Sequence, residues 1–172
     1  MSNLKQIGLT LLMYVEDYDG YLPTARVGTT SNTWFSLISK ITIIWVGYTT
    51  WYPKEPAIPF YFWRCPSAIK IKGETFDWYP FYKVSYTWNS MANYKKLNRN
   101  PNPSKSPIVY DGKSLYGTGY YGYSDLRNYA SPKRHLEGMN LLFLDGHVEW
   151  YPDNLWPRTG SGSRYAGFIW TW

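Results

Sequence analysis

The stretch from residue 2 to residue 23, SNLKQIGLTLLMYVEDYDGYLP, constrains the fold of this chain more than any other segment. Its apolar residues recur at the i, i+3, i+4, i+7 spacing that lays one stripe along an α-helix. The stripe consists of Leu4, Ile7, Gly8, Leu11, Leu12 and Val15, while Lys5, Gln6, Thr10 and Glu16 fall off it. The pattern therefore predicts an amphipathic helix that must bury one face against another layer of the protein.

Two further apolar residues, Leu9 and Met13, lie outside this stripe. Since the helix then carries more apolar surface than one sheet covers, we expect a second partner to use the rest. Asp19-Gly20 supplies a position for positive φ after the last turn, and Pro23 prevents continuation of the helix. We therefore expect a helix within residues 1–20 and a globular, β-rich part over residues 21–172.

At 172 residues the chain is long enough for one domain with a core of its own. No apolar run approaches the roughly 18 to 20 residues of a membrane span, and no secretion signal is recognisable. The single cysteine, Cys65, excludes an internal disulfide framework and provides no cysteine cluster for a metal. A net charge of +6 is compatible with an anionic partner without requiring one.

Residues 24–83 are predicted to form a long irregular segment with short strands. Residues 37–46 are apolar and β-branched, which fits a strand or a second short helix. Prolines at positions 53, 56, 59 and 66 favour extended or turning backbone. Alternation predicts a strand over residues 84–89, and the polar, basic run over residues 93–107 predicts a loop.

The second half of the chain holds the clearest strands. PIVYD, residues 107–111, reads as a strand, and the Gly- and Tyr-rich residues 113–131 read as surface loop. Two apolar runs flank Asp145-Gly146 within residues 140–151, which predicts a hairpin with a type I′ turn. The apolar end AGFIWTW is expected to dock on the sheet or on a neighbouring subunit. Together these elements predict an α+β fold, with the helix packed on a mainly antiparallel sheet with long irregular loops.

Two of these segments resemble bacterial type II secretion pseudopilins of a large prepilin-like group. SNLKQIGLTLLMYVEDYDGYLP is similar to the region that follows their membrane-spanning segment. RHLEGMNLLFLDGHVEW is similar to their C-terminal signature, in which a His and an Asp-Gly are separated by nine residues; here these are His135 and Asp145-Gly146. FWRCPSA, around Cys65, matches a Cys-Pro step of the same group.

The resemblance implies a pilin-like fold and a non-catalytic structural subunit of an extracellular filament or secretion pseudopilus. Such a subunit lies outside the cell or in the periplasm, associated with the cell surface. Its partners would be copies of itself and other pseudopilins, and its membrane contact would come only through a segment that this sequence lacks. Assembly would use the helix, with the following residues at the interface: Leu4, Ile7, Leu9, Leu11, Leu12, Met13 and Val15.

The resemblance also bears on Cys65. Members of this group commonly carry a cysteine just before the Ser-Asn-Leu block, where this chain has Met1. If such a residue has been lost by truncation, Cys65 is its expected disulfide partner; otherwise Cys65 is a lone thiol.

Two groups of side chains are weak candidates for a metal. His135, Asp145 and His147 are imidazole and carboxylate ligands, but Asp145 is also the residue that the hairpin turn needs. The favoured interpretation is that Arg134 and His135 cap or hydrogen-bond the hairpin.

The second group is acidic and lies at the helix C-terminus. Glu16, Asp17 and Asp19 are disfavoured there by the helix dipole, which invites a Lys, an Arg or Ca²⁺. EDYDG is far short of an EF-hand loop, so we expect no bound cofactor.

No catalytic constellation stands out. The sequence contains no G-x-S-x-G, H-E-x-x-H or Walker motif, and GTGYYG lacks the strand-to-helix context of a nucleotide loop. The absence of C-x-x-C-H excludes covalent haem. We therefore do not expect an enzyme.

Two binding interpretations stay open beside the filament. The residues Tyr94, Lys95, Lys96, Arg99 and Lys105 suit a nucleic-acid backbone, but a solvated loop explains them more simply. The 18 Tyr and 10 Trp, dense between residues 45 and 63 and between 78 and 88, suit stacking on polysaccharide or contacts between subunits. The alternative function is thus a secreted carbohydrate-binding module that uses exposed Trp and Tyr.

Overall fold

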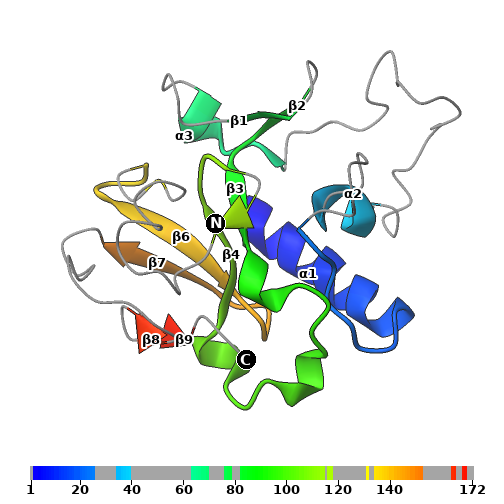
Figure 1. Cartoon of the computed structure of the whole chain (residues 1–172). Coiled ribbons are helices and arrows are strands. Elements are labelled where there is room, and N and C mark those ends of the chain that lie inside the picture. The colour runs from blue at the N-terminus through cyan, green and yellow to red at the C-terminus, as the bar shows by residue number, and fades with distance from the viewer. Residues whose placement is uncertain are drawn as a thin grey trace, which may run out of the picture.

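One helix packs on a five-stranded sheet in the computed structural model of the chain (Figure 1). The structure describes residues 2–25, 34–39, 63–69, 76–78, 82–114, 116–117, 131, 134–152, 164–165 and 168–169. The helix, α1 (Ser2–Asp17), lies against strand β6 (Gly138–Phe143), where Gly8 faces Leu142. The predicted α+β class is confirmed.

The strands of the main sheet lie in the order β5-β3-β4-β6-β7. Beside β6 they are β3 (Tyr86–Asn89), β4 (Pro107–Asp111), β5 (Tyr116–Gly117) and β7 (Val148–Pro152). β3, β4, β6 and β7 pair antiparallel, and β5 adds a short parallel edge to β3. Two small two-stranded sheets are also present, formed by β1 (Phe76–Trp78) with β2 (Tyr82–Val84) and by β8 (Arg164–Tyr165) with β9 (Phe168–Ile169).

The apolar stripe of α1 faces the core as predicted. Leu4, Ile7, Leu11 and Val15 are buried, and Leu12 is half-buried. Thr10 is buried too, although its polarity placed it off the stripe, because its hydroxyl donates a hydrogen bond to the Gln6 carbonyl at 2.9 Å.

The end of α1 follows the expected pattern. Asp19 and Gly20 both adopt positive φ, 54° and 81°, and the Gly20 amide donates to the Val15 carbonyl at 2.8 Å. Helical structure stops at Asp17. Among the described residues no helix has both the length and the apolar character needed to cross a membrane.

Three tryptophans form the centre of the core. Trp34, Trp63 and Trp88 are fully buried. Trp34 stacks on Trp88 and meets Trp63 edge-on, with ring centroids 5.5 Å apart in both pairs. This part of the aromatic excess therefore serves packing within the domain.

The structure decides one open alternative in the middle of the chain and departs from expectation at two other places. The segment that begins at residue 37 is helical through its first residues, in α2 (Trp34–Ser39), and residues 40–46 lie outside the described part. Pro66, expected in extended or turning backbone, starts the one-turn helix α3 (Pro66–Ile69), because proline is well suited to the first helical position. The strand expected over residues 84–89 is divided at Ser85 into β2 and β3.

The hairpin of β6 and β7 is confirmed, but its predicted type I′ turn is wrong. Gly146 has φ 87°, whereas Asp145 does not adopt positive φ. The Gly146 amide donates to the Phe143 carbonyl at 2.9 Å, as in a type I turn followed by a left-handed glycine. That turn needs positive φ at only one residue, which Asp-Gly satisfies without strain at the aspartate.

The remaining loop predictions are met in part. Residues 93–107 form the expected connection between β3 and β4, with short 3-10 turns at Leu97–Arg99 and Pro103–Lys105. Within the Gly- and Tyr-rich region, residues 116–117 form β5, and residues 118–130 lie outside the description. The described part of the C-terminal segment forms the β8–β9 pair, and its docking stays a prediction.

Candidate functional site

Three elements that lie far apart in the sequence bring Cys65, Asp111 and His135 together. Cys65 directly precedes α3, Asp111 ends β4, and His135 lies in the turn before β6. The Cys65 amide donates to the Ser85 hydroxyl at 3.0 Å, which holds this segment beside the break between β2 and β3.

The donor atoms of these three residues converge. Cys65 Sγ lies 3.1 Å from His135 Nε2, and the same nitrogen lies 3.4 Å from Asp111 Oδ2. Among the described residues, this is the one group of three or more His, Cys, Asp or Glu side chains whose ligand atoms lie within 4.8 Å of one another. Cys65 and Asp111 are buried, whereas a quarter of the His135 side chain is exposed.

The Asp111 carboxylate is held by buried donors on both oxygens. The Arg134 guanidinium lies 3.3 Å from Oδ1, and neither side chain is exposed to solvent. The amide and the side-chain nitrogen of Asn140 donate to Oδ2 at 2.6 and 2.9 Å. Arg134 donates in addition to the carbonyls of Ser85 and Gly112. The carboxylate is therefore fixed in place before any ligand arrives.

These contacts change the acidity of two groups. Burial, the largest single influence, raises the pKa of the Cys65 thiol, but the hydrogen bond with His135, a backbone hydrogen bond with Ala68 and the positive charge of His135 together place the pKa below its ordinary value. The hydrogen bond to Asp111, followed by that to Cys65, raises the pKa of His135 to about 9. The metal-free site thus favours a positively charged imidazole at His135.

A strained turn positions His135. Leu136 and Glu137 adopt φ of 53° and 58°, and His135 and Gly138 exchange backbone hydrogen bonds of 3.0 and 3.1 Å. This is a two-residue turn of the I′ kind built without glycine at its centre, which costs about 1–2 kcal/mol per residue. Strain of this kind concentrates where a site requires a particular geometry.

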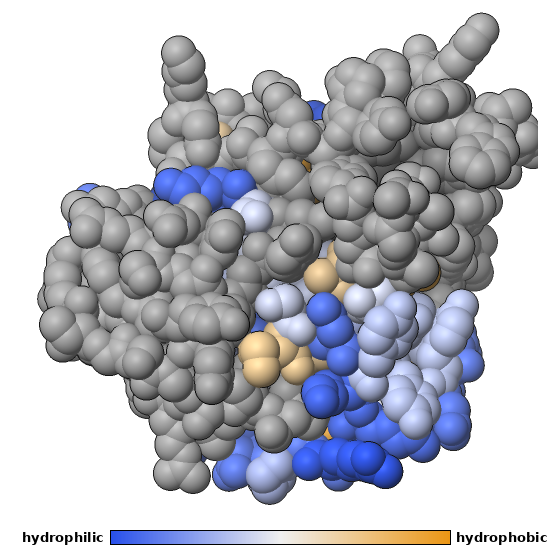
Figure 2. Space-filling view, in the orientation of Figure 1, coloured by the Kyte–Doolittle hydropathy of each residue, from blue (hydrophilic) through white to orange (hydrophobic). Residues whose placement is uncertain are grey.

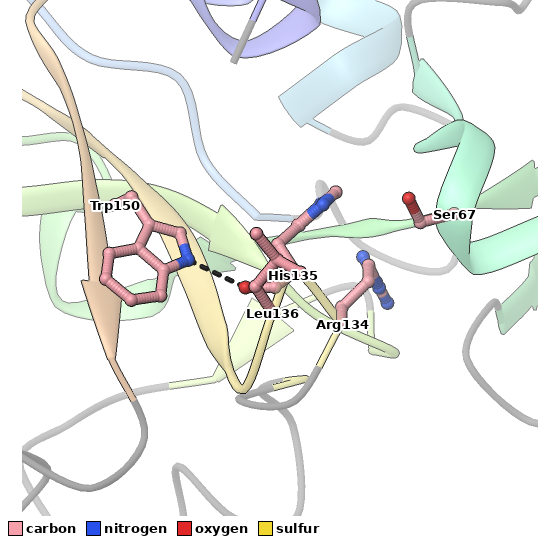
Figure 3. A pocket seen from close by; sticks show the side chains of 5 residues that line it. All are labelled: Ser67, Arg134, His135, Leu136 and Trp150. Carbon is pink, nitrogen blue, oxygen red and sulfur yellow. Dashed lines mark hydrogen bonds between the residues drawn. The ribbon is translucent and has the colours of Figure 1, made fainter.

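Trp150 of β7 clamps that turn. Its indole nitrogen donates to the His135 carbonyl at 2.7 Å, and its ring lies so close to Gly138 that a Cβ there would sit 2.5 Å from it. Figure 3 shows Trp150 on one side of the turn, with Arg134 and Ser67 on the other.

An open pocket of about 420 Å³ adjoins the cluster. It is lined by Ser67, Arg134, His135, Leu136 and Trp150 (Figure 3). Cys65 and Asp111 are not part of the lining, so His135 is the residue of the cluster that faces the pocket.

The geometry differs from that of a cysteine nucleophile with a proton relay. In such relays the two nitrogens of the imidazole face different partners, one the nucleophile and the other the carboxylate. Here Nε2 faces both Cys65 and Asp111. Three different donor atoms around one point instead suit a borderline metal ion.

The structure does not bring the weak metal candidates His135, Asp145 and His147 together as one group of ligands. His135 and Asp145 lie beyond opposite ends of β6, whose six residues span about 20 Å. Asp145 Oδ1 instead contacts His147 Nδ1 at 2.5 Å in the exposed hairpin turn. The favoured interpretation, that Arg134 and His135 cap or hydrogen-bond the hairpin, is met by the His135 carbonyl, which accepts a hydrogen bond from Trp150 of β7. Arg134 instead donates to Ser85, Gly112 and Ser131. Asp111 carries a signal that sequence reasoning missed: a carboxylate at the end of a fully buried strand.

One of the acidic residues at the end of α1 has a cationic partner. Asp19 pairs with Lys96 at 3.3 Å, so the expected compensating cation is a lysine. Lys96 in turn lies over the Tyr21 ring, 4.8 Å from its centroid. Neither Asp17 nor Asp19 belongs to a group of three potential ligands in the described part of the chain.

Two exposed surfaces lie outside the cluster. On α1, Leu9 and Met13 are 63 % and 43 % exposed, on the side away from the buried stripe. In the loop between β3 and β4, Lys95, Arg99 and Lys105 are exposed, as a solvated loop predicts. Figure 2 shows one face of the molecule, which is hydrophilic over most of its described area.

Comparisons with protein-family models, with curated proteins and with solved structures gave no match to this chain.

Proposed function

We propose that this chain is a non-enzymatic, pilin-like structural subunit of an extracellular filament or secretion pseudopilus. The observation that carries the proposal is the two-sided character of α1. One side is buried against the sheet, while Leu9 and Met13 stand exposed one turn apart on the other. A second copy of the chain is the occupant proposed for that exposed side.

The two segments that resemble pseudopilins pack directly on one another, which supports the proposal. Gly8 of α1 faces Leu142 of β6 so closely that a Cβ at position 8 would lie 2.7 Å from Leu142 Cδ1. A Cβ on Gly146, in the hairpin signature, would lie 3.2 Å from Leu12 Cδ1. Both ends of the resemblance thus belong to one interface between the helix and the sheet.

The proposed contact between copies can repeat from one subunit to the next. If α1 of one copy binds a different surface of the next, the contact is heterologous, and it builds a filament whenever the rotation does not close into a ring. Assembly into an extracellular or periplasmic structure, with other pseudopilins as further partners, follows as part of the same proposal.

The position of Cys65 also fits the pseudopilin pattern, although Cys65 is a free thiol here and a disulfide would need a cysteine where this sequence has Met1. The Asn3 side chain donates to the Arg64 carbonyl at 2.9 Å, so the first turn of α1 lies beside the segment that carries Cys65. A cysteine preceding the Ser-Asn-Leu block, as in pseudopilins, would therefore start close to Cys65. That pairing stays a prediction.

The test is assembly of a variant with a charged helix surface. Leu9→Glu combined with Met13→Glu removes the apolar pair, and Lys5→Glu, also exposed on α1, is the matched control. We expect filaments or concentration-dependent oligomers from the parent chain and the control, and monomers from the double variant, by sedimentation and negative-stain microscopy. Discrete monomers of the parent chain at every concentration would contradict the proposal.

A carbohydrate-binding module is the second candidate, because Trp150 is 38 % exposed beside the pocket. Trp34, Trp63 and Trp88, in contrast, are buried and unavailable to a sugar. Glycan binding that disappears in Trp150→Ala would favour this candidate, and its absence from the parent chain would dismiss it.

A further inference from the structure

The Cys65–Asp111–His135 cluster has the dimensions of a metal site. Zinc binds sulfur at about 2.3 Å and nitrogen or oxygen at about 2.0–2.2 Å, so neighbouring donors of a tetrahedral site lie roughly 3.3–3.8 Å apart. The separations are 3.1 Å for sulfur to nitrogen and 3.4 Å for nitrogen to oxygen, and the three ligand atoms all lie within 4.8 Å of one another. Small side-chain adjustments bring the three atoms onto one ion.

The donor set selects the kind of ion. One thiol, one imidazole and one carboxylate suit Zn²⁺ and its neighbours among the transition metals. Ca²⁺ and Mg²⁺ prefer oxygen ligands throughout, so a site with sulfur and nitrogen disfavours them.

The surroundings supply the outer shell that such a site needs. Ligating carboxylates in proteins are themselves held by hydrogen bonds. Asp111 receives them from Asn140 and Arg134, and the backbone of Cys65 is tied to Ser85. The guanidinium of Arg134 lies on Oδ1, the carboxylate oxygen away from the Oδ2 contact with His135. The ligands are therefore already ordered, and an ion would not have to assemble them.

The cluster is accessible from one side, where the pocket adjoins it. Cys65 and Asp111 are buried, and only His135 also lines the adjoining pocket. Three protein ligands with a fourth position reached from a pocket is the arrangement of accessible zinc sites, in which water or an incoming ligand completes the tetrahedron.

We propose that Cys65, Asp111 and His135 form a Zn²⁺-binding site whose fourth coordination position opens to the pocket beside Trp150. The ion joins the segment before α3, the end of β4 and the turn before β6. Because the unfolded chain does not hold these residues together, the ion binds the folded state and stabilises it. The site is independent of the exposed side of α1, so it can be present whether or not the chain assembles.

Cobalt titration of the full chain tests the proposal directly. The protein is reduced, stripped with a chelator and titrated with Co²⁺, which takes zinc sites and reports a thiolate ligand by a near-ultraviolet charge-transfer band. We expect the band to saturate at about one Co²⁺ per chain and to be displaced by Zn²⁺. Saturating Zn²⁺, about 100-fold above its Kd, should raise the thermal midpoint by about 5–10 °C.

Variants assign the ligands. Cys65→Ser should abolish the charge-transfer band, and His135→Asn should weaken Co²⁺ binding about 10- to 100-fold. His147→Asn is the matched control, since His147 contacts Asp145 in the hairpin turn instead of the cluster. If Cys65→Ser fails to fold, the presence or absence of the charge-transfer band in the parent chain still tests the proposal. No thiolate band at stoichiometric Co²⁺, or equal weakening by His147→Asn and His135→Asn, would overturn the proposal.

Discussion

The Nε2 atom of His135 lies 3.1 Å from the Sγ atom of Cys65, although 70 residues separate the two in the chain. The imidazole reaches the thiol only because the turn over residues 135–138 holds it there, with Trp150 hydrogen-bonded to the His135 carbonyl. The state of Cys65 is thereby coupled to the β6–β7 hairpin.

Asp111→Asn should be strongly destabilising. The substitution removes the negative charge that faces the fully buried Arg134 guanidinium, and removing one partner of a buried ion pair costs about 3–5 kcal/mol. Urea denaturation of the metal-free protein measures the loss. Asp145→Asn, in the exposed hairpin turn, is the control and should cost less than about 1 kcal/mol. Equal losses would show that the buried pair contributes nothing special.

The metal-free protein should show a pH dependence centred on His135. The folded pKa of about 9 lies above the ordinary 6.5, so the folded state binds the proton more tightly than the unfolded state. The stabilisation that comes from protonated His135 is complete below pH 6.5 and is lost as the pH rises through about 9. The titration of the His135 ring by NMR measures the pKa. A midpoint near 6.5 would contradict this assignment.

Leu136→Gly should stabilise the protein by about 1 kcal/mol. Leu136 is 93 % exposed and has φ 53°, so glycine relieves backbone strain without loss of buried surface. Leu9→Gly makes the same change at an exposed helical position and should destabilise by about 1 kcal/mol. The opposite signs, read from paired denaturation curves, separate strain at the turn from the general cost of glycine. Destabilisation by both variants would show that the turn is not strained.

The elements that depend on local sequence patterns could be predicted from the sequence alone. The apolar spacing of residues 4–15 predicts both the buried side of α1 and the exposure of Leu9 and Met13. The hairpin at Asp145-Gly146 is likewise local, but its turn type depends on backbone angles that the dipeptide Asp-Gly permits in two ways.

The candidate site could not be predicted from the sequence, because only the tertiary structure brings its residues together. His135 has Asp145 and His147 nearby in the sequence, yet its partners are Cys65 and Asp111, supplied by a segment before α3 and by β4. The amino-acid composition likewise did not predict which tryptophans are buried. Burial of Trp34, Trp63 and Trp88 follows from how α2 and residue 63 meet the sheet, which no count of aromatic residues reveals.

Gly146→Ala should cost more than Gly20→Ala, and the difference measures the contact between α1 and the hairpin. Both glycines have positive φ, 87° and 81°, so alanine imposes similar backbone strain of about 1 kcal/mol at each. A Cβ at position 20 meets nothing within 4 Å, whereas one at position 146 lies 3.2 Å from Leu12 Cδ1. Leu12 must then shift, which adds about 1 kcal/mol. Denaturation of the two variants measures the difference, and Leu12→Ala combined with Gly146→Ala should show less than additive loss. Equal costs for the two single variants would mean that Leu12 yields freely and that the Asp-Gly step is required by the turn alone.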